Sequence, residues 1–445
     1  MNVIHSELTT EQLIAHLQEA RARLLELVSD LSDEQMIGPR LAIVNPLRWE
    51  IAHVAHFQEF WLLRHLRGYE RITPADGLDS DKLYDSAQVN HSTRWDLPLP
   101  SKQTTIDYTQ RILDRVCEEA LKQAAPPDTA GYDDNYFLHL SLLHEDMHNE
   151  AITYTRQTLG YVLNPAFSRN LSFAEQPPKG GITNALGDTL IPGGAFRLGS
   201  ELNSGFVFDN ELRSREVMVA PFAMSRAATS NAEFLAFVED SGYCRQEFWS
   251  DEGWRWRESV NAEHPAYWRC ADGEWQRRVF DQWIPLEPSL PVVHVNWFEA
   301  DAYCRWSGRR LPTEAEWELA AAGIGKRKFP WGDEAPTPER ANLDWLAGGL
   351  APVDALPAGD SAFGVRQMIG NVWEWTATDF APFDGFTPGP YKEYSAPWFP
   401  NHGEAHKVLR GGCWATRSRL IRNGYRNFYK PDRRDVWAGF RTCAK

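Results

Sequence analysis

The segment HEDMHNE, residues 144–150, contains side chains that can bind a metal ion. His144 and His148 are four residues apart within a run of helical periodicity, so their imidazoles lie one turn apart on one face of the helix. Two histidines at this spacing make half of a metal site, because a protein-bound ion usually takes three or four protein ligands. A further ligand must therefore come from a second element.

The second element is expected in the segment WEIAHVAHFQE, residues 49–59, which contains His53 and His56. We expect His53 to be the ligand, because it continues a stripe formed with Trp49 and Ala52. In a helical bundle, ligands project inward from facing helices, and three histidines on two helices fit that arrangement. The alternative for each single histidine is an ordinary core or surface residue.

Glu145 makes the same segment match the His-Glu-x-x-His pattern of zinc proteases. Those enzymes need a third ligand, either a histidine shortly after the motif or a glutamate further along. Ala151 and Tyr154 follow the motif here, and Glu175 falls in a proline-rich stretch. The sequence therefore disfavours a protease.

Four blocks of helical periodicity occupy the first part of the chain and would position these histidines. They cover residues 9–32, 47–66, 105–125 and 136–160. A four-helix bundle buries four such amphipathic stripes together. We therefore predict a helical bundle domain over residues 1–165.

The remainder of the chain has a different composition. Residues 166–186 are polar and contain Pro-Pro and Gly-Gly, which predicts a linker. From residue 187 to 445, short apolar runs alternate with glycine, proline and asparagine, and tryptophan is frequent. This pattern predicts an irregular mixed domain, so the fold class of the whole chain is α+β.

Composition limits the partners and the compartment. The chain has 445 residues and a net charge of −15, which argues against a nucleic-acid or anionic-membrane partner. No stretch has the length and apolarity of a signal peptide or a membrane span, so we expect a cytoplasmic protein. Its six cysteines have no metal-ligand or disulfide spacing.

Both halves together resemble a known family. HEDMHNE with the upstream Trp49-x-x-Ala-His53 resembles the non-heme iron sulfoxide synthases of ergothioneine and ovothiol biosynthesis. The second half contains IPGGAFRLGS, RLPTEAEWE, FPWGD, GNVWEWT, VLRGGCWA and AGFR, which resemble the formylglycine-generating-enzyme-like (sulfatase-modifying-factor, C-type-lectin-like) domain of these enzymes. The resemblance implies a DinB-like bundle joined to that domain.

The resemblance also implies a cofactor and substrates. The family's three-histidine iron site falls on His53, His144 and His148, and imidazole ligands suit Fe²⁺. Three protein ligands leave positions for hercynine, for a sulfur or selenium donor and for O2, which would bring the reactants together on one ion.

Further site residues follow from the same resemblance. The family's asparagine at the betaine substrate falls on Asn427, and Tyr429, Trp414 and Phe380 are candidates for contact with hercynine or the donor through their rings. Arg94 is the candidate for a donor carboxylate. A calcium ion near Asn342 is left open.

The chain departs from the cysteine-derived-donor branch of the family at three places. The stretch LYDSAQVNHSTRWDLPLPS offers Arg94 and His91 but not the pair of arginines that holds donor carboxylates in that branch. Asn427 is followed by Phe428 and Tyr429 in place of Trp and Asp, so the usual partner of the donor's ammonium group is missing. Phe380 and Phe383 stand where tyrosines are common, so no catalytic residue is named. These departures, together with a likeness to selenoneine synthases, predict a selenosugar as the donor.

Three alternatives remain open at this point. The first is a hercynine sulfoxide synthase that uses cysteine or gamma-glutamylcysteine. The second is a protein of this architecture that binds a ligand without catalysis. The third, a copper-dependent formylglycine-generating enzyme, fits poorly, because Cys413 lacks the downstream paired cysteines and the histidines would have no role.

Overall fold

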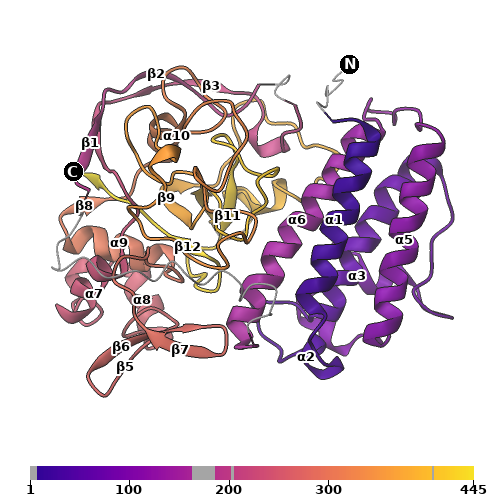
Figure 1. Ribbon diagram of the computed structural model, residues 1–445, viewed down its shortest axis with the longest axis horizontal. Coiled ribbons are helices and arrows are strands. Elements are labelled where there is room, and N and C mark those ends of the chain that lie inside the picture. The colour runs from indigo at the N-terminus through magenta and orange to yellow at the C-terminus, as the bar shows by residue number, and fades with distance from the viewer. Residues whose placement is uncertain (1–7, 163–185, 202–204, 403–404) are drawn as a thin grey trace. The chain divides into compact units, whose positions relative to one another are not determined.

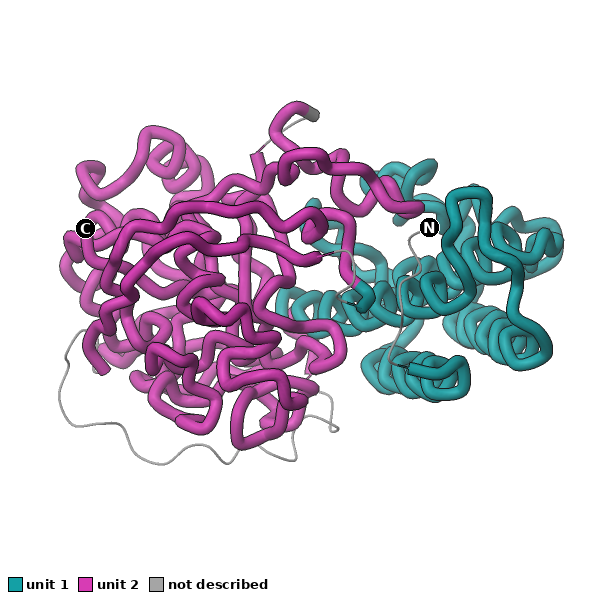
Figure 2. The backbone as a smooth tube through the Cα atoms, turned by 90° about the horizontal axis from the view of Figure 1, so that it is seen from above, with its two compact units in different colours: residues 1–159, 202–206 teal, residues 160–201, 207–445 magenta. Residues whose placement is uncertain are grey.

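The computed structural model describes residues 8–162, 186–201, 205–402 and 405–445. They form two compact units, which Figure 2 shows in different colours. Unit 1 comprises residues 1–159 and 202–206, and unit 2 comprises residues 160–201 and 207–445. Most of the predicted linker, 166–186, lies outside the described residues, so its limits and the domain boundaries at 165 and 187 stay predictions.

Unit 1 is a helical bundle. Its four long helices run side by side (Figure 1), with α1 against α6 and α3 against α5. Thr9 caps α1 through a reciprocal bond with Gln12, and Ser101 caps α5, so side chains satisfy the first backbone donors of both helices. The helices of unit 1 are α1 (Thr10–Val28), α2 (Asp33–Ile37), α3 (Leu47–Gln58), α4 (Ser80–Tyr84), α5 (Lys102–Lys122) and α6 (Asp134–Leu159).

Helix α3 continues directly into a π-helical segment, Glu59–His65. The wider turn changes which side chains face the bundle interior, and such segments are frequent at functional sites. Trp61 stacks on Phe137 of α6 at 5.1 Å between ring centroids and meets Phe57 edge-on at 6.1 Å. These aromatic contacts join the end of α3 to α6.

The described residues of unit 2 form short helices and four small sheets. One sheet has the order β1-β4-β13-β8 and another β11-β10-β9-β12, while β2-β3 and β5-β6-β7 are separate antiparallel ribbons. The helices are α7 (Asn231–Glu239), α8 (Asp251–Ser259), α9 (Trp297–Trp306) and α10 (Glu314–Ala322). The strands are β1 (Asp188–Ile191), β2 (Gly194–Leu198), β3 (Arg215–Val219), β4 (Phe222–Ser225), β5 (Trp268–Ala271), β6 (Glu274–Val279), β7 (Gln282–Pro285), β8 (Arg309–Arg310), β9 (Trp373–Asp379), β10 (Lys407–Arg410), β11 (Asn427–Tyr429), β12 (Ala438–Gly439) and β13 (Cys443–Ala444).

The sequence motifs of the second half meet in buried polar contacts. Glu374 of GNVWEWT accepts a hydrogen bond from the Trp317 indole at 2.7 Å and pairs with Arg441 of AGFR at 2.7 Å. Glu314 of RLPTEAEWE pairs with Arg410 at 3.2 Å and with Arg426 at 2.7 Å. All are buried, so each charge depends on its partner. These motif residues therefore stabilise the fold of unit 2.

The predicted α+β class, with a helical bundle followed by an irregular mixed domain, is confirmed. All six cysteines are free, in agreement with their spacing. Among the described residues, no helix has the length and apolarity needed to cross a membrane.

Candidate metal centre

His53, His144 and His148 come together in the interior of unit 1. One ring nitrogen from each lies within 4.8 Å of the others, and among the described residues this is the set whose spacing could hold a metal ion. The ring centroids are 5.2 Å apart for His53 and His144, 5.1 Å for His53 and His148, and 4.6 Å for His144 and His148. The structure thus brings together the three predicted ligands.

Hydrogen bonds at Nδ1 orient the imidazole rings of His53 and His148. Nδ1 of His53 lies 2.8 Å from the carbonyl oxygen of Tyr84, and Nδ1 of His148 lies 2.8 Å from a carboxylate oxygen of Glu50. Both acceptors require a proton on Nδ1, which leaves the lone pair on Nε2. An outer hydrogen bond of this kind is typical of metal-binding histidines.

Aromatic packing fixes the ring planes. The Phe57 ring stacks on His144 at 3.8 Å between centroids with an interplanar angle of 9°. The Trp49 ring stacks on His53 at 4.8 Å with an angle of 8°. Stacking restricts rotation of each imidazole about its side-chain bonds, so the two rings are held before any ion binds.

The surroundings also favour the neutral, ligating form of His53 and His144. Burial lowers the pKa of His53 and of His144 well below the ordinary value, and the neighbouring imidazole of His148 lowers both further. Imidazole nitrogens suit Fe²⁺ and related divalent metals. The residues therefore fit an iron ion, while metal binding itself stays a prediction.

His56, the alternative to His53, has a different role. Its Nε2 lies 2.7 Å from a carboxylate oxygen of Asp81, and Arg64 donates to that same carboxylate at 2.6 Å. His56 is thus bonded to a carboxylate of α4 that also pairs with Arg64, and it is not part of the histidine set that could hold an ion. His53 is the member of the pair that was predicted as the ligand.

Glu145, which completes the zinc-protease pattern, is also accounted for by packing. Its carboxylate is fully buried, pairs with Arg21 at 2.7 Å and accepts from Gln58 at 2.6 Å. Burial raises the pKa of Glu145, and Arg21 opposes that rise. The carboxylate therefore joins α6 to α1 and α3 in the bundle core, and the protease interpretation gains no support.

Arg94 lies in unit 1 with the histidines. It is 9% exposed, and its guanidinium lies 3.7 Å from the centroid of the Trp49 ring. It also donates to the side-chain oxygen of Asn45 at 2.6 Å. The predicted contact with a donor carboxylate stays a prediction.

The remaining predicted site residues belong to unit 2. Asn427 and Tyr429 are half-buried on β11, where the Asn427 side chain accepts from the Phe428 backbone at 2.8 Å. The guanidinium of Arg433 lies 5.1 Å from the centre of the Tyr429 ring. A positive charge over that ring disfavours a trimethylammonium group on the same face.

Phe380 and Trp414 are core residues of unit 2. Phe380 is fully buried and stacks on Phe428 at 3.9 Å between centroids. Trp414 is 1% exposed and meets Trp437 edge-on at 5.1 Å. Packing in the core accounts for both rings. Because neither side chain is exposed, the predicted contacts with a substrate gain no support from the structure and stay predictions.

Sequence reasoning missed the residues that support the ligands. Glu50 and Phe57 lie on α3 close to His53 in sequence, and a buried acid within an apolar helix face was the available signal for Glu50. The Tyr84 carbonyl could not be found in this way, because any residue type offers a backbone oxygen.

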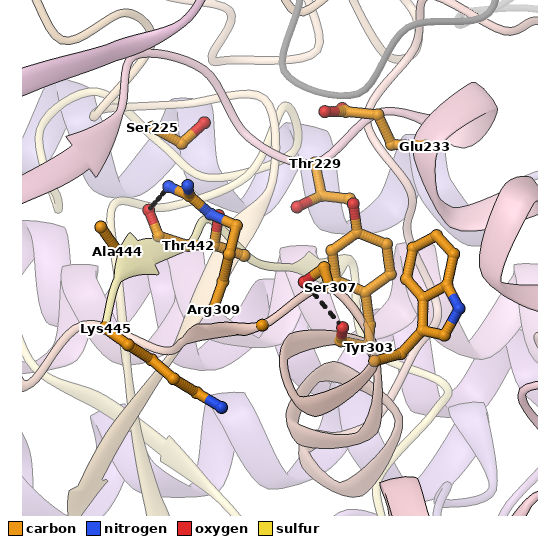
Figure 3. A pocket seen from close by; sticks show the side chains of 11 residues that line it. Ser225, Thr229, Glu233, Tyr303, Ser307, Arg309, Thr442, Ala444 and Lys445 are labelled. Atoms are coloured by element: carbon orange, nitrogen blue, oxygen red, sulfur yellow. Dashed lines mark hydrogen bonds between the residues drawn. The ribbon is translucent and has the colours of Figure 1, made fainter.

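Unit 2 contains a cavity of about 500 Å3 near the C-terminal end of α9 (Figure 3). Arg309 in its lining donates to the Thr442 hydroxyl at 2.6 Å and pairs with Asp188 at 2.7 Å. The Ser307 hydroxyl donates to the Tyr303 carbonyl at 2.9 Å. These polar groups are used within the chain, and the arrangement indicates structural roles for them.

Comparison with known protein families divides the chain in the same way. The DinB superfamily matches residues 16–152, and the Sulfatase-modifying factor enzyme 1-like domain matches residues 175–445. The first match contains all three histidines, and the second contains every motif quoted for the mixed domain.

Two known relatives match nearly the whole chain, and a third matches more than half of it. The hercynine oxygenase of Mycolicibacterium thermoresistibile is 37% identical, with 97% of this chain and 94% of that protein covered. The hercynine oxygenase of Mycolicibacterium smegmatis is 35% identical, with 97% and 98% covered. A formylglycine-generating enzyme of Thermomonospora curvata is 34% identical and covers 58% of this chain and 94% of its own length.

These relatives confirm the prediction of an oxygen-dependent enzyme and the resemblance to the sulfoxide synthase family. The two-part architecture, the full-length similarity and the histidine set agree with one another. The chain belongs to the hercynine oxygenase family.

Proposed function

We propose that this protein is an iron(II)-dependent oxygenase that joins the imidazole C2 of hercynine to a sulfur or selenium donor. The observation that carries the proposal is the convergence of His53, His144 and His148 in a chain similar over 97% of its length to a hercynine oxygenase. A bound Fe²⁺ would supply the activation of O2 for the coupling of the two substrates.

The chain's own residues would prepare the site for that ion. Glu50 would keep the proton of His148 on Nδ1, and the Tyr84 carbonyl would keep the proton of His53 on Nδ1. The Nε2 atom of each ring would then be available to the ion. Phe57 and Trp49 fix ring planes, and burial limits water at the ligands. A site ordered in advance loses less conformational entropy when the ion and substrates bind.

The proposed reaction balances without another reactant. Hercynine loses hydrogen from C2, the donor loses hydrogen from sulfur or selenium, and a new carbon–chalcogen bond forms. One oxygen atom of O2 becomes the S=O or Se=O oxygen, and the other leaves as water with the two hydrogens. The product is a sulfoxide or a selenoxide, and a separate reductant would resolve it.

Asn427 is the proposed contact for the betaine end of hercynine. It lies on the edge strand β11, where one side of the strand pairs with β10. Its side-chain amide can donate to the hercynine carboxylate while the oxygen keeps its bond to the Phe428 backbone.

Two donors are to be distinguished. The resemblance to hercynine oxygenases favours a cysteine-derived thiol, namely cysteine or gamma-glutamylcysteine. The residues of this chain favour a selenosugar, because Phe428 and Tyr429 replace an ammonium partner and Arg94 is already held by Trp49 and Asn45. We propose the selenosugar, which makes the protein a selenoneine synthase, with the thiol as the second candidate.

The test is the mass of the product. The protein would be loaded with Fe²⁺ without air, mixed with hercynine and a 1-selenosugar, gamma-glutamylcysteine or cysteine in parallel, and then exposed to air. A selenoxide formed only with the selenosugar supports the proposal, and a sulfoxide formed only with a thiol assigns the second candidate. No product with any donor would contradict both and favour a non-catalytic binding protein.

A further inference from the structure

Arg94 is enclosed by the same part of unit 1 that contains the histidines. It lies in a short 3-10 helix, His91–Asp96, and is 9% exposed. One guanidinium nitrogen donates to the Asn45 side chain at 2.6 Å, and the other lies 3.3 Å from the Val89 carbonyl. Its planar face covers the Trp49 ring at 3.7 Å.

Trp49 connects Arg94 to a metal-site histidine. One face of its ring meets the guanidinium, and the ring also stacks on His53 at 4.8 Å with an interplanar angle of 8°. The Trp49 indole nitrogen donates to the Leu83 carbonyl at 2.6 Å. Because Trp49 is 1% exposed and bonded at its edge, it has little freedom to rotate.

Two consecutive backbone carbonyls hold the two rings. The Leu83 carbonyl accepts from Trp49, and the Tyr84 carbonyl is bonded to Nδ1 of His53. The end of α4 therefore sets the rotation of both rings about their side-chain bonds. A shift of the Trp49 ring would disturb its stacking on the His53 imidazole and so the orientation of that imidazole.

We infer that Arg94 is a positioning residue for the metal centre, which acts on His53 through Trp49. The cation–π contact, which is stronger in a buried site, holds the Trp49 ring that stacks on the imidazole of His53. This role differs from that of a clamp for a donor carboxylate, because both terminal nitrogens of the guanidinium donate inside unit 1, to Asn45 and to the Val89 carbonyl, and the group lies over the Trp49 ring. The inference rests on the proposed metal site.

The test compares metal binding with donor binding in the full chain. Arg94→Gln removes the charge and the planar fork, Arg94→Lys keeps only the charge, and Arg40→Gln is a matched control. Arg40 is exposed and lies 5.9 Å from the Trp95 ring. The measurements are the Co²⁺ dissociation constant and visible spectrum without organic substrates, and then the KM of each donor.

We expect Arg94→Gln to raise the Co²⁺ dissociation constant about tenfold and to shift the spectrum, as loss of an outer contact does at other metal sites. Arg94→Lys should show a smaller change because its ammonium group can keep a cation–π contact with Trp49, and Arg40→Gln should show none. The donor KM should stay within about twofold.

An unchanged dissociation constant and spectrum, with a donor KM raised tenfold, would overturn the inference and assign Arg94 to donor binding. No change in either quantity would overturn it as well. If Arg94→Gln does not fold, by far-ultraviolet circular dichroism, Arg94→Lys decides under the same criteria. Because Co²⁺ binding is measured without hercynine, a failure of the proposed reaction leaves this result readable.

Discussion

The carboxylate of Glu50 on α3 lies 2.8 Å from Nδ1 of His148 on α6, so a residue of one helix orients a histidine of the other. Glu50 is 1% exposed, and its acceptor oxygen fixes the proton of His148 on Nδ1, which leaves the lone pair on Nε2 for an ion. This contact joins bundle packing to the geometry of the metal site.

Replacing Glu50 should therefore weaken metal binding. Glu50→Ala should raise the Fe²⁺ or Co²⁺ dissociation constant about 10- to 100-fold, because His148 loses the partner that holds its orientation. Glu50→Gln should have a smaller effect, since its amide oxygen can still accept. The exposed Glu34→Gln is the control, and equal metal affinity of Glu50→Ala and this control would contradict the role.

The histidine assignment predicts a difference between neighbouring residues. His53→Ala and His144→Ala should each abolish stoichiometric metal binding, whereas His56→Ala should retain it, because His56 is bonded to Asp81. Metal content per chain after anaerobic loading and gel filtration is the measurement. Loss of the metal from a folded His56→Ala protein, with retention in His53→Ala, would reverse the assignment.

Asp81 should make a pH-dependent contribution to stability. The hydrogen bond with His56 is the main cause that holds the pKa of Asp81 well below its ordinary value. Arg64 lowers this pKa further, although partial burial raises it. Because the folded-state pKa lies below that of the unfolded chain, the stabilisation is present above about pH 4 and is lost as the pH falls below it.

Asp81→Asn should consequently lower the free energy of unfolding by about 1–3 kcal/mol at neutral pH. The difference from the natural protein should shrink below about pH 4. Urea titrations at several pH values measure it, with the exposed Asp76→Asn as the control. A difference that does not change with pH would show that the ion pair is not its cause.

The motif residues of unit 2 should affect stability. Glu374→Gln would leave the buried Arg441 without its carboxylate partner and should cost about 3–5 kcal/mol of unfolding free energy. Denaturant unfolding followed by tryptophan fluorescence measures this loss. Glu374→Gln with the stability of the natural protein would contradict the structural role.

The sequence was sufficient to predict the helical bundle and the histidine cluster, because helical spacing determines which residues share a face. His144 and His148 needed only their separation, and His53 needed only the stripe on its helix. The supporting contacts were beyond such reasoning. The Tyr84 carbonyl and the stacking of Phe57 on His144 depend on how helices pack, and the π-helical segment after Gln58 changes the periodicity that sequence reasoning assumes.

The roles expected for Phe380 and Trp414 illustrate a second limit. Aromatic residues near a predicted site have the same sequence signal whether they contact a ligand or fill a core, and here both are buried. Exposure, which only the three-dimensional structure gives, separates the two roles.

Oxygen uptake by the iron-loaded protein tests the central claim most directly. With hercynine and the correct donor both present, we expect consumption of one O2 per hercynine, a product whose mass is that of hercynine, the donor and one oxygen atom less two hydrogen atoms, and loss of both signals in His144→Ala. Oxygen uptake that does not depend on hercynine, or a coupled product formed equally well by His144→Ala, would contradict the claim.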